Sequence, residues 1–450
     1  MKPNILFITA DDMNYNSTGI YGCEVENVTP NINNLGEEGI RFEHAHVNIA
    51  ICQPSRQVLM TGRYPHRNGA PGFDPIDSNI PTITEELDKE GYINGIVGKV
   101  IHLEPEDKYC WDTCIKVYND ENDYGRNPEL YFKYCKEFFE KANHKNQPFF
   151  MMANSHDPHR PFVNSKQEKR TFDRHIDYSR EYNSVEISVP DFLPDIPPVR
   201  KEIAQYYSSV HRCDETVGQI LRALEETGNK ENTIVMFISD NGMAFPFAKT
   251  NCYLNSTRTP WIVRWPEEIK AGVVDKKHII SGIDFMPTIL DAVGLEQIEG
   301  MDGESFLPLL KGETQSNRED VFTVMNKTYA ERYYPMRCIQ NKKYGYIFNS
   351  WSDNMTFFIN ESKSGLTYRA MEEAAEDDGE IKKRVDMYNY RQKEEFYDFE
   401  NDPDALNNLI NDPEYEQKIN EFRNKLIKKM AKTEDPLLEE YKQSLKGILP

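Results

Sequence analysis

Short, continuous apolar runs constrain the fold of this 450-residue chain more than any other feature. The clearest run covers residues 4–10, and residues 149–154 and 232–239 repeat its design, with a weaker example at residues 95–98. Runs of this length, apolar at every position, are typical of strands buried on both faces of a parallel sheet. The chain is therefore expected to bury at least four strands between layers of helices.

Helical patterns separate these runs, and the longest covers residues 203–227, with Gly228 placed to end it. Strands that alternate with helices indicate an α/β fold. We therefore predict a large, mostly parallel sheet flanked by helices.

The composition of the chain changes after about residue 285. Residues 285–312 contain Pro287, Pro308 and several glycines, which is typical of a transition between domains. Beyond it we expect half-exposed strands at 334–337 and 344–348, a charged surface loop or helix at 371–384, and a terminal helix at 413–433. This pattern predicts a catalytic domain at 1–315 and a smaller α+β domain at 316–450.

Polar side chains follow each of the four expected strands. Asp11 and Asp12 follow the first, Asp240 and Asn241 follow the run that ends at residue 239, and Lys99 follows the weakest one. In sheets of this kind, ligands bind beyond the carboxyl ends of the strands. We therefore expect these side chains to meet at one edge of the sheet.

Asp11, Asp12, Asp240 and Asn241 offer hard oxygen ligands. Such ligands suit Ca²⁺, or Mg²⁺, better than zinc. Neighbouring carboxylates repel one another, and a cation between them would relieve that cost. Acids in a solvated loop are the alternative interpretation of the Asp pair.

The segment Cys52-Gln53-Pro54-Ser55-Arg56 combines a thiol, a proline, a hydroxyl and a cation, and Thr61-Gly62 follows it. Pro54 suits the first turn of a helix, so Cys52 is expected just before a helix N-terminus, where anions are stabilised. Arg56 can bind an oxyanion with two hydrogen bonds, and its charge is a reason to expect a lowered thiol pKa. A buried structural cysteine before an ordinary helix is the alternative.

The net charge of −21 argues against nucleic acid or an anionic membrane as a general partner. No stretch approaches the roughly 18 apolar residues of a membrane span. An anionic substrate would therefore need a local group of cations. The candidates are Lys99, His102, His156, His159, Arg160 and Lys249. Taken singly, each can also be a solvated charge or a packing residue.

The eight cysteines include no Cys-x-x-Cys pair, so zinc-finger and thioredoxin functions are disfavoured, while disulfide pairing stays open. The first residues show no secretory signal. Localisation is therefore open: the protein is cytoplasmic, or it is periplasmic or secreted if a signal peptide has been removed.

The Cys52 segment matches the pattern C-x-P-S-R-x4-T-G at every defined position. With Ala10-Asp11-Asp12, Gly98-Lys99, His156 and Ser239-Asp240-Asn241-Gly242, it makes the whole chain resemble a type I sulfatase of the alkaline phosphatase superfamily. The resemblance implies the sulfatase fold and the oxidation of Cys52 to formylglycine by a maturation enzyme. The hydrated aldehyde would then attack sulfur.

The resemblance also implies a role for most of the candidate residues. Asp11, Asp12, Asp240, Asn241 and the modified Cys52 would bind the metal ion. Arg56, Lys99 and Lys249 would hold the sulfate oxygens and the nucleophile, and His102 and His156 would transfer protons. Apart from the resemblance, the local positive charge of His159 and Arg160 predicts that these two residues bind the substrate.

Residues 156–160, 239–253, 334–337 and 395–403 resemble the heparan N-sulfatase branch of the family. Two departures affect the sulfate side of the site: two residues separate Lys99 from His102, as in iduronate 2-sulfatases, and Lys249 stands where the N-sulfatases have Arg. We predict an exo-acting sulfatase of heparan or heparin glucosamine N-sulfate. The alternatives are an O-sulfatase on glycosaminoglycan sugars, a phosphonate or phosphate ester hydrolase, and an inactive carbohydrate-binding homologue.

Overall fold

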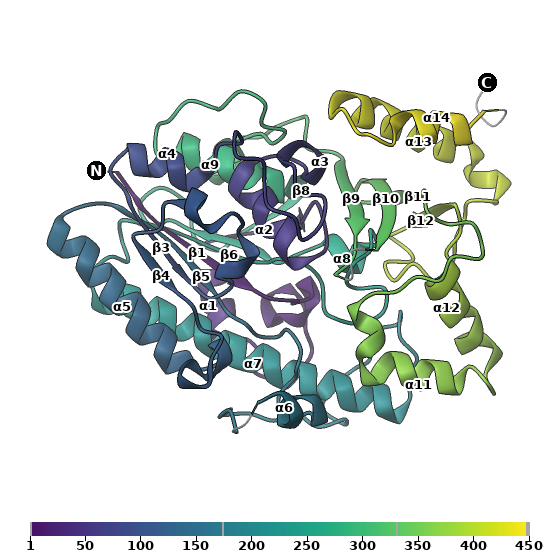
Figure 1. Ribbon diagram of the computed structural model, residues 1–450, viewed down its shortest axis with the longest axis horizontal. Helices are drawn as coiled ribbons and strands as arrows, with labels where there is room; N and C mark the ends of the chain where they lie inside the picture. The colour runs from purple at the N-terminus through teal and green to yellow at the C-terminus, as the bar shows by residue number, and fades with distance from the viewer. Residues whose placement is uncertain (1, 173–174, 330–331, 447–450) are drawn as a thin grey trace.

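The computed structural model describes residues 2–172, 175–329 and 332–446 (Figure 1). Its largest element is an eight-stranded sheet with the order β4-β3-β5-β1-β6-β7-β2-β8. β7 runs antiparallel to both neighbours, and the other pairs are parallel, which confirms the predicted sheet. The strands are β1 Asn4–Ala10, β2 Ile40–His46, β3 Ile93–Val97, β4 Thr113–Ile115, β5 Phe149–Asn154, β6 Thr233–Ser239, β7 Trp261–Arg264 and β8 Val273–Ser281.

The central strands follow the sequence pattern closely. β1 and β5 have the predicted bounds, β6 begins one residue later, and β3 begins two residues earlier. All four are buried along their whole length. Because β3, β5, β1 and β6 are adjacent and parallel, their carboxyl ends share one edge, as predicted.

Helices cover both faces of this sheet (Figure 1). Leu6 and Ile8 of β1 belong to a core with α1, α5 and α7, while Ile5 and Phe7 belong to a second core with α4, α9 and α10. The helices of the first core are α1 Pro30–Glu37, α5 Pro128–Lys145 and α7 Pro197–Glu226. Those of the second are α4 Ile83–Lys89, α9 Phe285–Ala292 and α10 Leu307–Leu310. The strand residues alternate between two apolar layers, which explains the continuous apolar run.

The helix predicted at 203–227 is longer than expected. It begins at Pro197, since two prolines fit its first turn, where their missing N–H groups need no partner. Gly228 ends it as predicted, with φ +75° and its N–H donating to the Glu225 carbonyl at 3.0 Å.

The C-terminal part is built on a four-stranded antiparallel sheet, β12-β11-β10-β9. Its strands are β9 Val321–Lys327, β10 Tyr333–Gln340, β11 Tyr344–Asn349 and β12 Glu394–Asp398. Its helices are α11 Leu366–Ala374, α12 Gly379–Tyr390, α13 Glu416–Lys432 and α14 Leu438–Ser444. The four short helices elsewhere are α2 Cys52–Thr61, α3 Pro65–Asn68, α6 Lys166–Thr171 and α8 Leu254–Thr257.

The strands expected to be half-exposed are largely buried instead, so that prediction is wrong. α13 packs against β10 and β11, and the small sheet also contacts the large domain. There, Gln340 donates to Thr257 Oγ1 at 3.1 Å, and the Val324 N–H donates to the Asn48 carbonyl at 2.8 Å. The hydrophobic pattern of one strand does not show which other segments will cover its second face.

The other expected C-terminal elements are also present. The charged segment 371–384 is helical through most of its length, in α11 and α12, and a 3-10 turn at Pro413–Tyr415 precedes α13. The segment 285–312 contains α9 and α10, which pack on the large sheet. The predicted boundary at 315/316 lies between α10 and β9, and residues 1 and 447–450 of the predicted domains lie outside the described residues. None of the described helices is both long and apolar enough to cross a membrane.

A buried ion pair ties α7 to the loop after β5. Arg212 Nε donates to Asp157 Oδ2 at 2.7 Å, and its Nη2 donates to Oδ1 at 3.1 Å, with both side chains at most 1% exposed. Arg212→Met is expected to lower the free energy of unfolding by about 3–5 kcal/mol, because it removes both hydrogen bonds to a buried carboxylate and leaves it with the longer, 3.5 Å contact to Arg126 Nε. Urea unfolding measures this change.

Arg222→Met on the same helix is the matched control, since its side chain is 45% exposed and its ion pairs lie at the surface. Its effect should stay below about 1 kcal/mol. If Arg212→Met and Arg222→Met lowered the free energy of unfolding equally, the importance of the buried pair would be contradicted.

Candidate active site

Cys52 begins α2 and faces the acids that follow β1. Its Sγ atom lies 3.5 Å from Asp11 Oδ1 and 3.8 Å from Asp12 Oδ1. Burial raises the pKa of the thiol well above its usual value; Lys249 opposes the rise, and the carboxylates add to it. The expected lowering of this pKa is therefore wrong, because desolvation and the adjacent negative charges dominate. The geometry does not favour a reactive thiolate.

The strand ends bring three carboxylates together at Cys52. Oxygen atoms of Asp11, Asp12 and Asp240 lie within 4.8 Å of one another, and all three side chains are buried. Asn241 donates from Nδ2 to Asp12 Oδ1 at 2.6 Å. Solvated loop acids are thus excluded as an explanation of the Asp11-Asp12 pair.

Each of these carboxylates has a cation beside it. Lys99 forms an ion pair with Asp11, Lys249 Nζ lies 2.8 Å from Asp12 Oδ2, and Arg56 Nη2 lies 2.7 Å from Asp240 Oδ2. Burial raises the pKa of the Asp11 carboxyl, but Lys99, His159, Arg56 and Lys249 together outweigh burial, so this pKa falls well below its usual value. Burial raises the pKa of Asp240 despite Arg56, and Asp11 and Asp12 add to the rise. Burial and the neighbouring carboxylates therefore disfavour the charged form of Asp240.

The donor set fits a hard divalent cation. Three carboxylates supply oxygen ligands, and Asn241 Oδ1, a fourth, is buried without a hydrogen-bond donor among the described residues. Oxygen-only sites of this kind prefer Ca²⁺ or Mg²⁺. The four predicted metal ligands are thus brought to one place.

His156 has both ring nitrogens engaged with the main chain. Its Nδ1 lies 2.9 Å from the Tyr124 carbonyl, and its Nε2 accepts from the Lys99 N–H at 3.2 Å. Lys99 has the left-handed conformation, φ 54°. Gly98 before it allows a close approach, since an added Cβ would lie 2.3 Å from the Asn154 carbonyl. His156 therefore positions Lys99 in this structure.

His159 lies close to the predicted nucleophile. A ring nitrogen lies within 4.8 Å of Cys52 Sγ, and Nε2 lies 3.8 Å from Asp12 Oδ2 and 3.3 Å from Glu361 Oε1. Its Nδ1 lies 2.6 Å from the Arg160 carbonyl. The side chain is 25% exposed, so Nε2 can reach a bound substrate.

His102 and Arg160 lie on the walls of the site. Burial and, next, Lys99 lower the pKa of His102 well below its usual value, so its ring is neutral. Arg160 forms an ion pair with Glu202 of α7, and its guanidinium donates to the Ala244 carbonyl. Arg160 lines the site, but these contacts already engage its donors.

These residues surround a cavity of about 470 Å³. It is lined by Cys52, Phe73, Lys99, Ile101, His102, Tyr118, Tyr124, Arg126, His156, His159, Arg160, Pro161, Phe172, Tyr329 and Glu361. Cys52 and Lys99 are the buried part of this lining, while Ile101 and Tyr329 are exposed at the mouth. The arrangement can hold a small anionic group at Cys52 with a larger organic group toward solvent.

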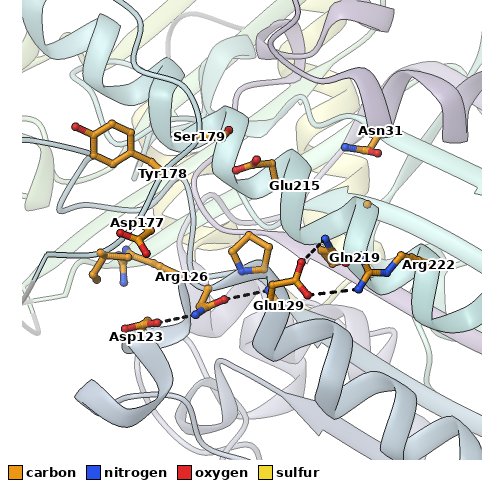
Figure 2. A pocket seen from close by; sticks show the side chains of 14 residues that line it. Asn31, Asp123, Arg126, Glu129, Asp177, Tyr178, Ser179, Glu215, Gln219 and Arg222 are labelled. Atoms are coloured by element: carbon orange, nitrogen blue, oxygen red, sulfur yellow. Dashed lines mark hydrogen bonds and ion pairs between the residues drawn. The ribbon is translucent and has the colours of Figure 1, made fainter.

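A larger groove, of about 830 Å³, lies between α5, α7 and residues 176–179 (Figure 2). Among the described residues, its lining includes four carboxylates, of Asp123, Glu129, Asp177 and Glu215, and two guanidinium groups. Glu129 accepts from Gln219 and Arg222 across it. An excess of negative charge opposes an anionic substrate, so the smaller cavity is the candidate active site.

Several residues of the site were not predicted. Glu361 reaches the cavity from a segment with no recognisable pattern, and nothing in the sequence could have placed it there. Asn154 ends β5, where its Oδ1 accepts from Arg56 Nη1 at 2.6 Å, and Asp157 holds the adjacent loop through Arg212. Asn154 and Asp157 lie at or just after the end of a buried strand, and this position is the sequence signal that could have identified them.

A mostly parallel sheet flanked by helices, with this acid cluster beside a cysteine at a helix start, is the arrangement that the resemblance to sulfatases predicts. The profile of the sulfatase family matches residues 3–295, and a second profile, N-sulphoglucosamine sulphohydrolase, C-terminal, matches residues 243–362. The chain belongs to the sulfatase family, and it is an enzyme that hydrolyses sulfate esters or sulfamates. Formylglycine and a divalent metal ion are typical of this family.

Among curated proteins, human N-sulphoglucosamine sulphohydrolase is 29% identical over 96% of this chain and 91% of its own length. An ulvan-active sulfatase of Formosa agariphila is 29% identical over 95% of this chain and 79% of its own. The similarity thus extends through both sheets.

Solved structures show the same fold. A protein in complex with its substrate D-glucosamine-2-N,6-O-disulfate has a TM-score of 0.73 at 21% identity, covering 97% of this chain and 99% of its own. The phosphonate monoester hydrolase of Agrobacterium radiobacter has a TM-score of 0.70 at 18% identity, covering 96% of both chains.

Calcium ions should stabilise the protein through the acid cluster. A ligand that binds only the folded state raises the free energy of unfolding, by about 2.7 kcal/mol at a free concentration 100 times its Kd. Asp240→Asn removes one charged ligand and is expected to abolish most of this increase. Melting temperatures with calcium and with a chelator measure it.

The control is Asp377→Asn, the same change at an exposed position of the C-terminal part. It should keep the full calcium effect. Undiminished calcium stabilisation in the Asp240 variant would contradict the metal site.

Proposed function

We propose that this protein releases sulfate from sulfated sugars, with non-reducing-end glucosamine N-sulfate as its substrate. One observation carries the proposal: Cys52 faces the carboxylates of Asp11 and Asp12, whose partners Lys99 and Lys249 can turn to a sulfate oxygen. The human relative named for N-sulphoglucosamine, and the matching C-terminal profile, support the choice of sugar.

Formylglycine made from Cys52 would supply the nucleophile, and a divalent ion on Asp11, Asp12, Asp240 and Asn241 would supply the charge that activates it. Lys99 and Lys249 are placed to hold the sulfate oxygens, and Arg56, buried against Asp240 and Asn154, orients the acid cluster. Fixed cations of this kind stabilise charge that develops on the sulfuryl group.

The leaving amine or alcohol needs a proton, and the geometry supports His159 as its donor. The resemblance to sulfatases implied His102 and His156, but the main chain engages both nitrogens of His156. His159 lines the cavity, and its Nε2 lies 3.3 Å from Glu361 Oε1 and 3.8 Å from Asp12 Oδ2.

Cys52→Ala is expected to abolish sulfate release and to leave the melting temperature within a few degrees, because the side chain makes no contact that the fold needs. Sulfate is measured by ion chromatography with N-, 2-O- and 6-O-sulfated heparin disaccharides. Cys114→Ala, at an exposed thiol, is the control and should stay active.

The same panel separates the alternatives. Release from only an O-sulfated sugar would replace the N-sulfatase proposal, and faster turnover of a phosphonate ester would favour the phosphonate hydrolase. An unmodified Cys52 in protein from its natural host, with sugar bound but no sulfate released, would mark an inactive homologue. Sulfate release by Cys52→Ala would contradict the assignment of Cys52 as the source of the nucleophile.

His159→Ala is expected to lower kcat on a sugar sulfamate by about 10²- to 10⁴-fold, because general acid catalysis contributes that much. With 4-nitrophenyl sulfate, whose leaving group needs no proton, the loss should be far smaller. His144→Ala, at the exposed end of α5, is the control. Equal losses on both substrates would remove His159 as the proton donor.

A further inference from the structure

Glu361 brings a negative charge from the C-terminal part into the cavity that holds Cys52. It begins a 3-10 turn, Glu361–Ser364. Its Oε2 lies 2.8 Å from Lys249 Nζ, and its Oε1 lies 3.3 Å from His159 Nε2. Among the described residues that line the cavity, Glu361 is the only acid, and it contacts two groups placed to act on the substrate.

The carboxylate has capacity for further partners. Burial raises its pKa, but Lys249 and then His159 outweigh burial and lower the pKa to about 2, so the group is charged at neutral pH. An ionised carboxylate offers about four acceptor positions. The contacts to Lys249 and His159 use two, and the side chain is 26% exposed. The remaining positions are available to a ligand in the cavity.

The turn that carries Glu361 is fixed from both sides. Asn360 accepts from Tyr388 OH at 2.8 Å, and Ser362 is fully buried. Lys363 Nζ lies 3.5 Å from the centroid of the Phe357 ring and donates to Asn389 Oδ1. A carboxylate on so rigid a turn is presented in one position, as a recognition group must be.

A charge of this sign opposes sulfate binding. Lys249 is already paired with Asp12, so it does not require a second carboxylate for balance. The energetic cost of an acid beside the sulfate position is offset if the carboxylate accepts hydrogen bonds from the substrate.

The exposed apolar side chains at the mouth of the cavity are a second feature that suits a sugar. Ile101 and Tyr329 are 50% and 72% exposed there, which is unusual for large apolar side chains. Phe73 meets the Tyr329 ring edge-on, with centroids 6.1 Å apart. Apolar surface beside the Glu361 carboxylate suits a sugar ring, which has C–H faces and hydroxyl edges.

We propose that Glu361 is a specificity residue whose carboxylate accepts hydrogen bonds from hydroxyl groups of the sugar that carries the sulfate. Phe73 and Tyr329 pack against the C–H face of the same ring. The inference rests on the proposed function, since it names the part of the enzyme that recognises the sugar. It gives the C-terminal part a direct contact with substrate.

The test compares glucosamine N-sulfate with its 3-deoxy, 4-deoxy and 6-deoxy analogues, because all four share one leaving group. Matured wild-type enzyme should lose about 10- to 100-fold in kcat/KM on at least one analogue, as for a hydrogen bond to a charged acceptor. In Glu361→Ala and Glu361→Gln, kcat/KM on the same analogue should be less than about threefold below kcat/KM on the parent sugar. A residue that acted only through Lys249 or His159 would slow all four substrates equally.

Glu376→Gln, the same charge change at an exposed position of the C-terminal part, should keep the wild-type profile. Melting temperatures confirm that each variant is folded. Parallel profiles in wild type and both Glu361 variants, or a wild type indifferent to every hydroxyl, overturn the inference alone. Matured wild type that releases no sulfate from the parent sugar overturns the proposed function, and this inference with it.

Discussion

Charge balance at one buried edge of the large sheet is the constraint on which the rest of the structure depends. Asp11, Asp12 and Asp240 are fully buried, and unpaired buried carboxylates would be very costly. Lys99, Lys249 and Arg56 each approach one of them, from three separate segments. The pairing of each buried acid with a cation therefore holds three distant segments together at this edge.

The supports of the site form a second layer of buried contacts. Asp157 joins the loop after β5 to α7 through Arg212, and His156 in that loop fixes the backbone of Lys99. The loop therefore holds Lys99 on one side and His159 on the other. Rigid supports of this kind keep catalytic side chains within the narrow geometry that the chemistry needs.

Much of the fold and of the site could be predicted because their signals are local. β1 and β5 are apolar at every position, and Asp11, Asp240 and Lys99 each follow a strand end. The thiol pKa, the buried faces of β10 and β11, and Glu361 could not be predicted. Each depends on charges or surfaces that distant segments supply, and a segment's own pattern does not record them.

The sequence by itself determined the sheet, the acids at its carboxyl edge and the maturation pattern at Cys52, since strand burial and a contiguous motif are properties of neighbouring residues. Only the tertiary structure decided which cation meets which carboxylate, which histidine contacts Glu361, and that Glu361 lies beside Lys249. Those facts arise where segments far apart in the chain pack together, because Coulomb energy and desolvation depend on distance in space.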